Sequence, residues 1–158
     1  MLLLSHANAM TRSSPEKLGV ATTEKPLFVP LRVARSLLEE PHYLSVAIGE
    51  IRSSGRHPPI IRLFLSTETA KMQVGSPEHL GSLTIFPWPR ASRAAVTKAA
   101  FNLSRRLSEL PEALRVIPNS SDVELTIGVA IIPDQREDAD VSVDVLSIEI
   151  TANDGGPL

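Results

Sequence analysis

The stretch from residue 122 to residue 132 constrains the fold more than any other, because polar and apolar residues alternate along it. Apolar side chains occupy every second position, at Val123, Leu125, Ile127, Val129 and Ile131. Successive side chains of a β-strand point to opposite faces, so this pattern predicts an antiparallel strand with one buried face and one face in water.

Shorter alternating segments occur along the rest of the chain, at residues 28–34, 43–51, 61–65, 83–86 and 141–150. Pro30 lies within the first of them and predicts an edge strand, because proline cannot donate a backbone hydrogen bond. In the last segment the apolar positions change phase near Val145 and Leu146, which predicts a β-bulge or a strand that passes from one sheet to the other. Together the segments predict an all-β fold with minor α content: an antiparallel β-sandwich of about seven strands, with a short helix late in the chain.

Residues 91–110 allow two interpretations. Ser92 is a suitable helix cap, and apolar residues at spacings of three and four predict one long helix. Phe101 and Leu103 also alternate with Asn102, which favours a strand followed by a helical turn capped by Ser104 and ended before Pro111. The sequence leaves both interpretations open.

A chain of 158 residues fits one domain. Residues 1–26 are polar, rich in serine and threonine, and without period, so we expect a flexible N-terminal arm, then a sandwich over residues 27–151 and a flexible tail over residues 152–158. The first ten residues lack the basic region and the apolar run of about 7–15 residues of a secretory signal, and Met10 is an alternative start. No segment approaches the roughly 20 apolar residues of a membrane span. With no cysteine in the chain, these features predict a cytoplasmic protein without a membrane partner.

No motif for catalysis stands out in the sequence. The four histidines (His6, His42, His57 and His79) do not have the spacing of a shared metal site, and neither G-x-S-x-G nor G-x-x-x-x-G-K-[ST] occurs. The carboxylates of residues 134–140 lie in one charged loop, which is typical of a solvated surface. We therefore expect no enzyme, and no catalytic, cofactor-binding or metal-binding residue in this chain.

Charge is distributed unevenly along the chain. Residues 122–158 contain nine of the 18 acidic residues but only one of the 16 basic ones. This asymmetry indicates either two solvated surfaces or a device that orients a partner or a second copy. Basic residues are also frequent between residues 90 and 106, as on a solvated helical face or a docking surface for an acidic partner. Only Trp88 and Phe101 provide aromatic rings nearby, so we expect no nucleic-acid partner.

Two segments carry a family resemblance: RLFLSTETA at residues 62–70 and HLGSLTIF at residues 79–86. They resemble the carboxy-terminal β-sandwich domain of tyrosinases and polyphenol oxidases, the type-3 copper proteins. The positions that match the family pattern are Arg62, Phe64, Ala70, Gly81 and Phe86. Ser66 stands where the family usually has asparagine, Glu68 stands where it often has proline, and His79 lies one place closer to the glycine than the family histidine.

The resemblance extends over about residues 27–151 and implies a sandwich that packs over a separate helical domain. In the family that other domain binds two copper ions through six histidines and oxidises phenols, and this chain lacks those ligands. The resemblance therefore implies a non-catalytic accessory module that shields, stabilises or assembles a type-3 copper oxidase partner. Copper is then a cofactor of that partner and not of this chain.

Trp88 lies between two prolines in a stiff, extended segment, where it either anchors an interface or closes the end of the sandwich. For the accessory module we expect a partner interface made of Arg62, His79, Phe86 and Trp88. Two alternatives stay open. One is a structural or self-assembling sandwich that forms homo-oligomers, and the other is an enzyme or small-ligand carrier with a pocket between the sheets.

Overall fold

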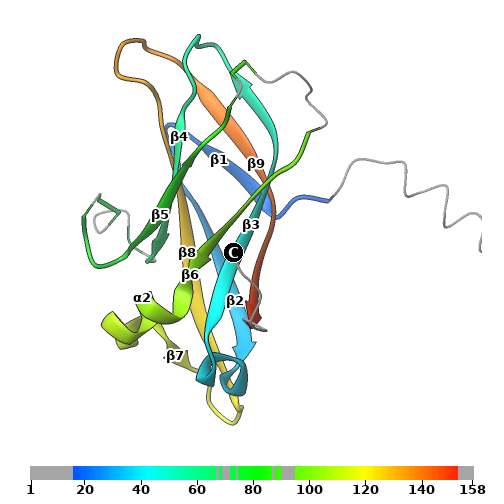
Figure 1. Cartoon of the computed structure of the whole chain (residues 1–158), viewed down its shortest axis with the longest axis vertical. Helices are drawn as coiled ribbons and strands as arrows, with labels where there is room; N and C mark the ends of the chain where they lie inside the picture. The colour runs from blue at the N-terminus through cyan, green and yellow to red at the C-terminus, as the bar shows by residue number, and fades with distance from the viewer. Residues whose placement is uncertain are drawn as a thin grey trace, which may run out of the picture.

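The computed structural model describes residues 16–66, 68, 72–73, 75–86, 88–89 and 95–152, which form two antiparallel sheets around one core (Figure 1). Sheet A has the spatial order β1 (Gly19–Thr22), β9 (Val141–Ala152), β3 (His42–Ser53) and β6 (Thr97–Asn102). Sheet B has the order β2 (Leu27–Ala34), β8 (Asp122–Ile132), β4 (Ile60–Leu65) and β5 (His79–Thr84), and the short β7 (Arg115–Val116) also pairs with β8. The helical elements are η1 (Arg35–Glu39), α2 (Leu103–Glu109) and η3 (Pro111–Ala113). The predicted all-β fold with minor α content is confirmed.

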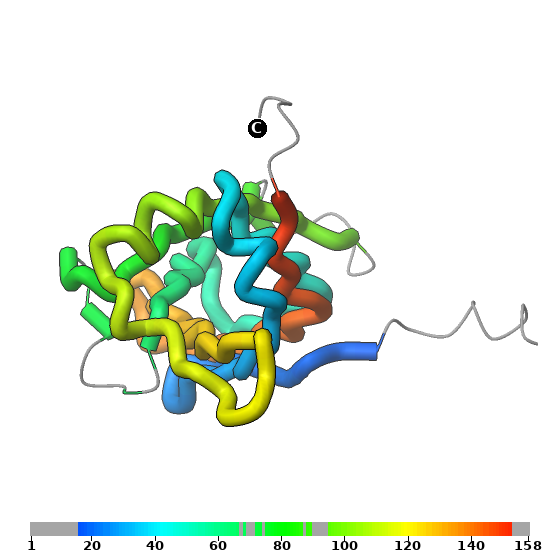
Figure 2. Tube along the Cα trace, turned by 90° about the horizontal axis from the view of Figure 1, so that it is seen from below, coloured from blue at the N-terminus to red at the C-terminus, as the bar shows by residue number. Residues whose placement is uncertain are grey.

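Strand β8 lies inside sheet B, because β2 pairs with one of its edges and β4 with the other. Its odd-numbered apolar residues are at most 4% exposed and belong to the core between the sheets. Pro30 lies in β2, which pairs only with β8 within the described part of the chain, so the predicted edge strand is confirmed. Helix α2, η3 and β7 gather at one end of the sandwich (Figure 1), which is the end seen in Figure 2.

The predicted irregularity in β9 is a bulge within sheet A. Val145 pairs with Ile48 and Ser147 pairs with Ala47, which leaves Leu146 as the extra residue. The Leu146 side chain lies over Gly49, where a Cβ would be 2.8 Å from Leu146 Cδ2. A residue larger than glycine at this position would have to displace the Leu146 side chain.

The segment with two interpretations forms a strand followed by a helix. Residues 97–102 pair with β3 as β6, and α2 begins at Leu103. The helix cap is Asn102 and not the predicted Ser104: Asn102 Oδ1 accepts the Arg105 N–H at 3.0 Å, and the Ser104 hydroxyl donates to the same oxygen at 3.1 Å. Ser92, the cap of the long-helix interpretation, lies outside the described residues. Pairing with β3 outweighs the local helical preference of this segment.

Residues 19–22, which the sequence placed in a flexible arm, form β1 and pair with residues 142–145 of β9. Strand β9 continues to Ala152, one residue beyond the boundary expected for the sandwich. Residues 1–15, including the alternative start Met10, and residues 153–158 lie outside the described part. Within that part, no helix has the length and apolar character needed to cross a membrane.

Acidic residues of the last two strands pair with basic residues from the first half of the chain. Asp122 of β8 accepts a hydrogen bond from Arg32 Nε at 2.9 Å. Asp144 of β9 lies 2.7 Å from Arg52 Nη2 and 3.5 Å from Lys17 Nζ. Because β8 lies beside β2, and β9 lies between β1 and β3, the fold itself brings the opposite charges together. Part of the charge asymmetry of the sequence is therefore neutralised inside the chain.

Candidate functional site

Two of the expected interface residues, Arg62 and His79, lie on neighbouring strands of sheet B. Arg62 is within β4, and His79 begins the edge strand β5. Burial lowers the pKa of the His79 imidazole below its ordinary value, and the positive charges of Arg62 and Arg106 act in the same direction. Nε2 of His79 lies 3.1 Å from the Ser82 hydroxyl oxygen. Arg62 Nε is buried, and no described residue accepts a hydrogen bond from it. The structure thus brings Arg62 and His79 close together on one strand pair.

An aromatic cluster on the outer face of sheet B adjoins His79. The Phe64 and His79 ring centroids are 5.1 Å apart, and Phe64 is 1% exposed although it lies outside the core between the sheets. Gly128 of β8 pairs with Phe64 on one side and with Phe28 on the other. A Cβ at Gly128 would be 2.8 Å from Met72 Cε, so the glycine makes room for the Met72 side chain. The sequence signal for this cluster is Phe64 itself, an aromatic residue at a position that alternation assigns to the polar face.

The other two expected interface residues, Phe86 and Trp88, differ in how far they are buried. Phe86 follows β5 and is 76% exposed, which is an unusually high value for a large apolar side chain. Trp88 is half-buried and packs against the core, with its indole N–H buried and without an acceptor among the described residues. Ile85, next to Phe86, is 4% exposed and fixes the chain at this point. Phe86 is therefore largely exposed to water, whereas Trp88 packs against this part of the sandwich.

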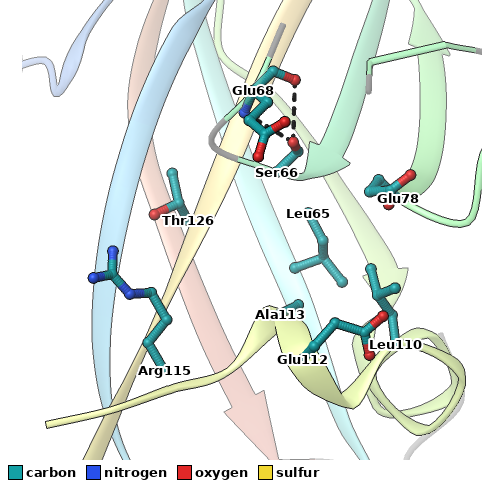
Figure 3. A pocket seen from close by; sticks show the side chains of 9 residues that line it. All are labelled: Leu65, Ser66, Glu68, Glu78, Leu110, Glu112, Ala113, Arg115 and Thr126. Carbon is teal, nitrogen blue, oxygen red and sulfur yellow. Dashed lines mark hydrogen bonds between the residues drawn. The ribbon is translucent and has the colours of Figure 1, made fainter. Parts of the chain in front are cut away.

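A cleft of about 200 Å³ lies at the end of sheet B near α2 (Figure 3). Its apolar lining comes from Leu65, Leu110 and Ala113, of which Leu65 and Leu110 are buried. Its polar lining consists of Ser66, Glu68, Glu78, Glu112, Arg115 and Thr126. The sequence carries no signal for this cleft, because its walls come from four separate segments of the chain.

The cleft lies where sheet B is interrupted. The pairing of β4 with β8 ends at Leu65 and Ile127, and the pairing of β7 with β8 involves Arg115 and Glu124. Between these two pairs, β8 has no strand partner on this side within the described part of the chain. Thr126 is therefore accessible from the cleft.

Three charged side chains of the cleft have no partner in the described part. No described residue forms an ion pair or a side-chain hydrogen bond with Glu78, Glu112 or Arg115, whereas the Ser66 hydroxyl donates to the Glu68 carbonyl oxygen at 3.1 Å. Figure 3 shows Glu78 and Glu112 on the side of the cleft where Leu110 lies, and Arg115 on the side where Thr126 lies. The cleft therefore presents separate negative and positive regions.

Metal ligands do not gather in the part of the chain that the structure describes: it contains no group of three or more histidine, cysteine, aspartate or glutamate side chains suited to a metal ion. The described histidines lie in different elements. His42 begins β3, His57 lies in the β3–β4 loop, and His79 begins β5. His42 is 2% exposed, and its Nδ1 lies 2.7 Å from the Glu40 carbonyl oxygen, so that Nδ1 carries the donated proton.

These features define an antiparallel β-sandwich with two distinct surface regions, one around Phe86 and one at the cleft. No protein-family model matches the sequence, and no curated protein matches it.

Solved structures similar to this chain include two polyphenol oxidases. One is a recombinantly expressed latent aurone synthase (polyphenol oxidase), with a TM-score of 0.43, 14% identity, and coverage of 90% of this chain and 26% of that chain. The other is latent aurone synthase (polyphenol oxidase) from a natural source, with a TM-score of 0.46, 15% identity, and coverage of 89% of this chain and 29% of that chain. The chain thus spans between a quarter and a third of the length of these two proteins.

Proposed function

We propose that this chain is an accessory module that covers and stabilises a type-3 copper oxidase, with the copper bound by the partner. The class of partner rests on the family resemblance of residues 62–70 and 79–86. Within these segments, Arg62 and Phe64 lie on β4 and Gly81 lies on the adjacent β5. Ala70, the remaining match before the connector, lies outside the described residues.

The observation that carries the proposal is the exposure of Phe86. A phenyl ring that is 76% exposed loses contact with water when a partner covers it, and aromatic side chains are enriched among the residues that dominate binding. The buried neighbour Ile85 anchors the backbone beside Phe86, so less backbone order has to be gained on binding. Arg62 pairs with Ser82 along β5, and His79 lies at the other end of this strand from Phe86, so an interface that includes all three residues has to extend along β5.

The test mixes the full chain with the catalytic domain of a polyphenol oxidase and measures binding by sedimentation velocity and calorimetry. We expect a one-to-one complex that Phe86→Ser weakens by about tenfold or more. Val116→Ser is the matched control, because Val116 is 70% exposed on β7, at the end of the sandwich where α2 lies. Phe86→Ser should leave the thermal midpoint unchanged, since the ring is largely in water.

Absence of binding at micromolar concentrations, or equal effects of the two substitutions, would refute the proposal. The same sedimentation runs examine self-association. A dimer of the chain alone that Phe86→Ser dissociates would assign this surface to a homo-oligomer instead.

A further inference from the structure

We propose that the cleft near α2 binds one basic side chain, lysine or arginine, from a peptide segment of a partner protein. This site is independent of the Phe86 surface. Glu78 precedes β5 and Phe86 follows it, so the two regions lie at opposite ends of a strand of six residues, roughly 20 Å long. Failure of one proposal leaves the other intact.

The charge of the cleft favours a cation. Glu78 and Glu112 alone contribute two carboxylates against the single guanidinium of Arg115 in the lining. Glu78 and Glu112 have no cationic partner among the described residues, whereas four of the eight described acidic residues between positions 122 and 152 do. Carboxylates that share a cleft repel each other, and a bound cation relieves this repulsion.

The size and lining of the cleft fit a side chain better than a metabolite. Its volume of about 200 Å³ is below the roughly 300–1,000 Å³ of most small-molecule sites. Leu65, Leu110 and Ala113 provide an apolar surface. Lysine and arginine place their methylene groups on such a surface while the charged end reaches a polar rim. The same occupant thus satisfies both the apolar and the acidic parts of the lining.

Arg115 indicates that the ligand is a peptide. Its guanidinium has five N–H donors and lies on the side of the cleft away from Glu78 and Glu112 (Figure 3). It therefore needs an acceptor that is separate from the cation. A peptide provides that acceptor in the backbone carbonyl groups beside its basic side chain, whereas a simple amine does not.

The experiment is a titration of the ¹⁵N-labelled full chain followed by NMR. The probe is the peptide acetyl-Gly-Gly-Lys-Gly-Gly-amide, compared with the same peptide containing norleucine and with butylamine. We expect the lysine peptide to bind with a millimolar Kd and to shift the amide signals of the cleft, in particular those of Ser66, Glu78, Glu112 and Thr126. Norleucine, which has the stem without the charge, should give no saturable shift, and butylamine should bind more weakly than the peptide.

Substitutions then identify the groups that hold the ligand. Glu78→Gln and Glu112→Gln should each weaken the lysine peptide by about fivefold. Arg115→Gln should weaken the peptide and leave butylamine unchanged. Glu149→Gln is the control, because Glu149 is an exposed carboxylate of β9 in sheet A. None of the cleft substitutions removes an ion pair or a side-chain hydrogen bond within the described part of the chain, so the spectra should otherwise keep their dispersion.

Four results would overturn the proposal. The first is equal binding of the norleucine peptide, and the second is absence of any saturable shift up to about 20 mM lysine peptide. The third is binding that survives in the Glu78→Gln/Glu112→Gln double variant. Butylamine that binds as tightly as the peptide would refute the assignment to a peptide.

Discussion

Gly81→Ala tests a contact that joins the two sheets. Gly81 pairs with Leu63 in sheet B, and a Cβ built on it would lie 2.5 Å from both Cδ1 and Cε1 of Phe101 in sheet A. Carbon atoms in contact are normally about 3.5–4.0 Å apart, so the phenyl ring has to move by roughly 1 Å. Phe101 packs against the core, and its backbone pairs with Leu44 of β3, so the new methyl group meets a ring that is anchored on both counts.

Overpacking of this kind costs about 1–3 kcal/mol of the free energy of unfolding. For a chain of this length, such a loss lowers the thermal midpoint by roughly 2–12 °C. Circular dichroism on heating and urea denaturation measure the two quantities independently. Urea denaturation should show a lower midpoint with an unchanged slope, because the variant exposes the same surface when it unfolds.

The double variant with Phe101→Leu separates this steric effect from a general cost of alanine in β5. Leucine lacks the ring edge that meets the new methyl group, so Gly81→Ala should cost much less in that background. We expect a coupling energy of about 1 kcal/mol or more between the two positions. Equal costs of Gly81→Ala in both backgrounds would refute the reasoning, as would a variant as stable as the parent chain.

Two further predictions concern charged groups of the fold. Asp144→Asn should lower the free energy of unfolding, measured by urea denaturation, by about 1 kcal/mol, because the carboxylate is 13% exposed and accepts a hydrogen bond from Arg52. High salt should reduce this difference between the parent chain and the variant. Glu137→Gln should lower the denaturation midpoint at neutral pH, because the carboxylate accepts the N–H groups of Arg56 and His57, each at 2.9 Å. These hydrogen bonds lower the pKa of Glu137, so the unfolded chain binds the proton first as pH falls. The difference between parent and variant should therefore be complete above its ordinary pKa of 4.5 and shrink as pH falls below it, and a difference that grew toward low pH would contradict this account.

The fold class could be predicted because its signal is local. Alternation in β8 fixes one buried face, and the change of phase at Leu146 marks the bulge without any knowledge of neighbouring strands. The four residues of β1 and the two of β7 gave no such signal. They become strands because β9 and β8 offer them free edges, which is a property of the assembled sheets. The choice between helix and strand for residues 97–102 depends in the same way on pairing with β3.

The candidate sites could be predicted only in part. The resemblance singled out Arg62 and Gly81. The structure explains why position 81 holds glycine, because the Phe101 ring lies directly against it. The exposure of Phe86 and the packing of Trp88 depend on the path of the chain after β5. The sequence, with two aromatic residues among prolines, does not indicate that path. The cleft could not be predicted at all. Glu78 and Arg115 line the same cleft only because β7 pairs with β8 beyond the point where β4 ends.

Both surface regions lie along β5, and this arrangement bears on what a partner has to be. Strand β5 pairs only with β4 within the described part, so it presents an edge with Phe86 after one end and Glu78 before the other. Roughly 20 Å separates the two ends, which is within the width of one interface of standard size. If one partner covers both regions, Phe86→Ser and Glu78→Gln weaken the same complex, and only the effect of Glu78→Gln diminishes with salt. If the regions serve different partners, each substitution affects one complex and leaves the other unchanged. The salt dependence of the two variants therefore decides between one continuous interface and two separate ones.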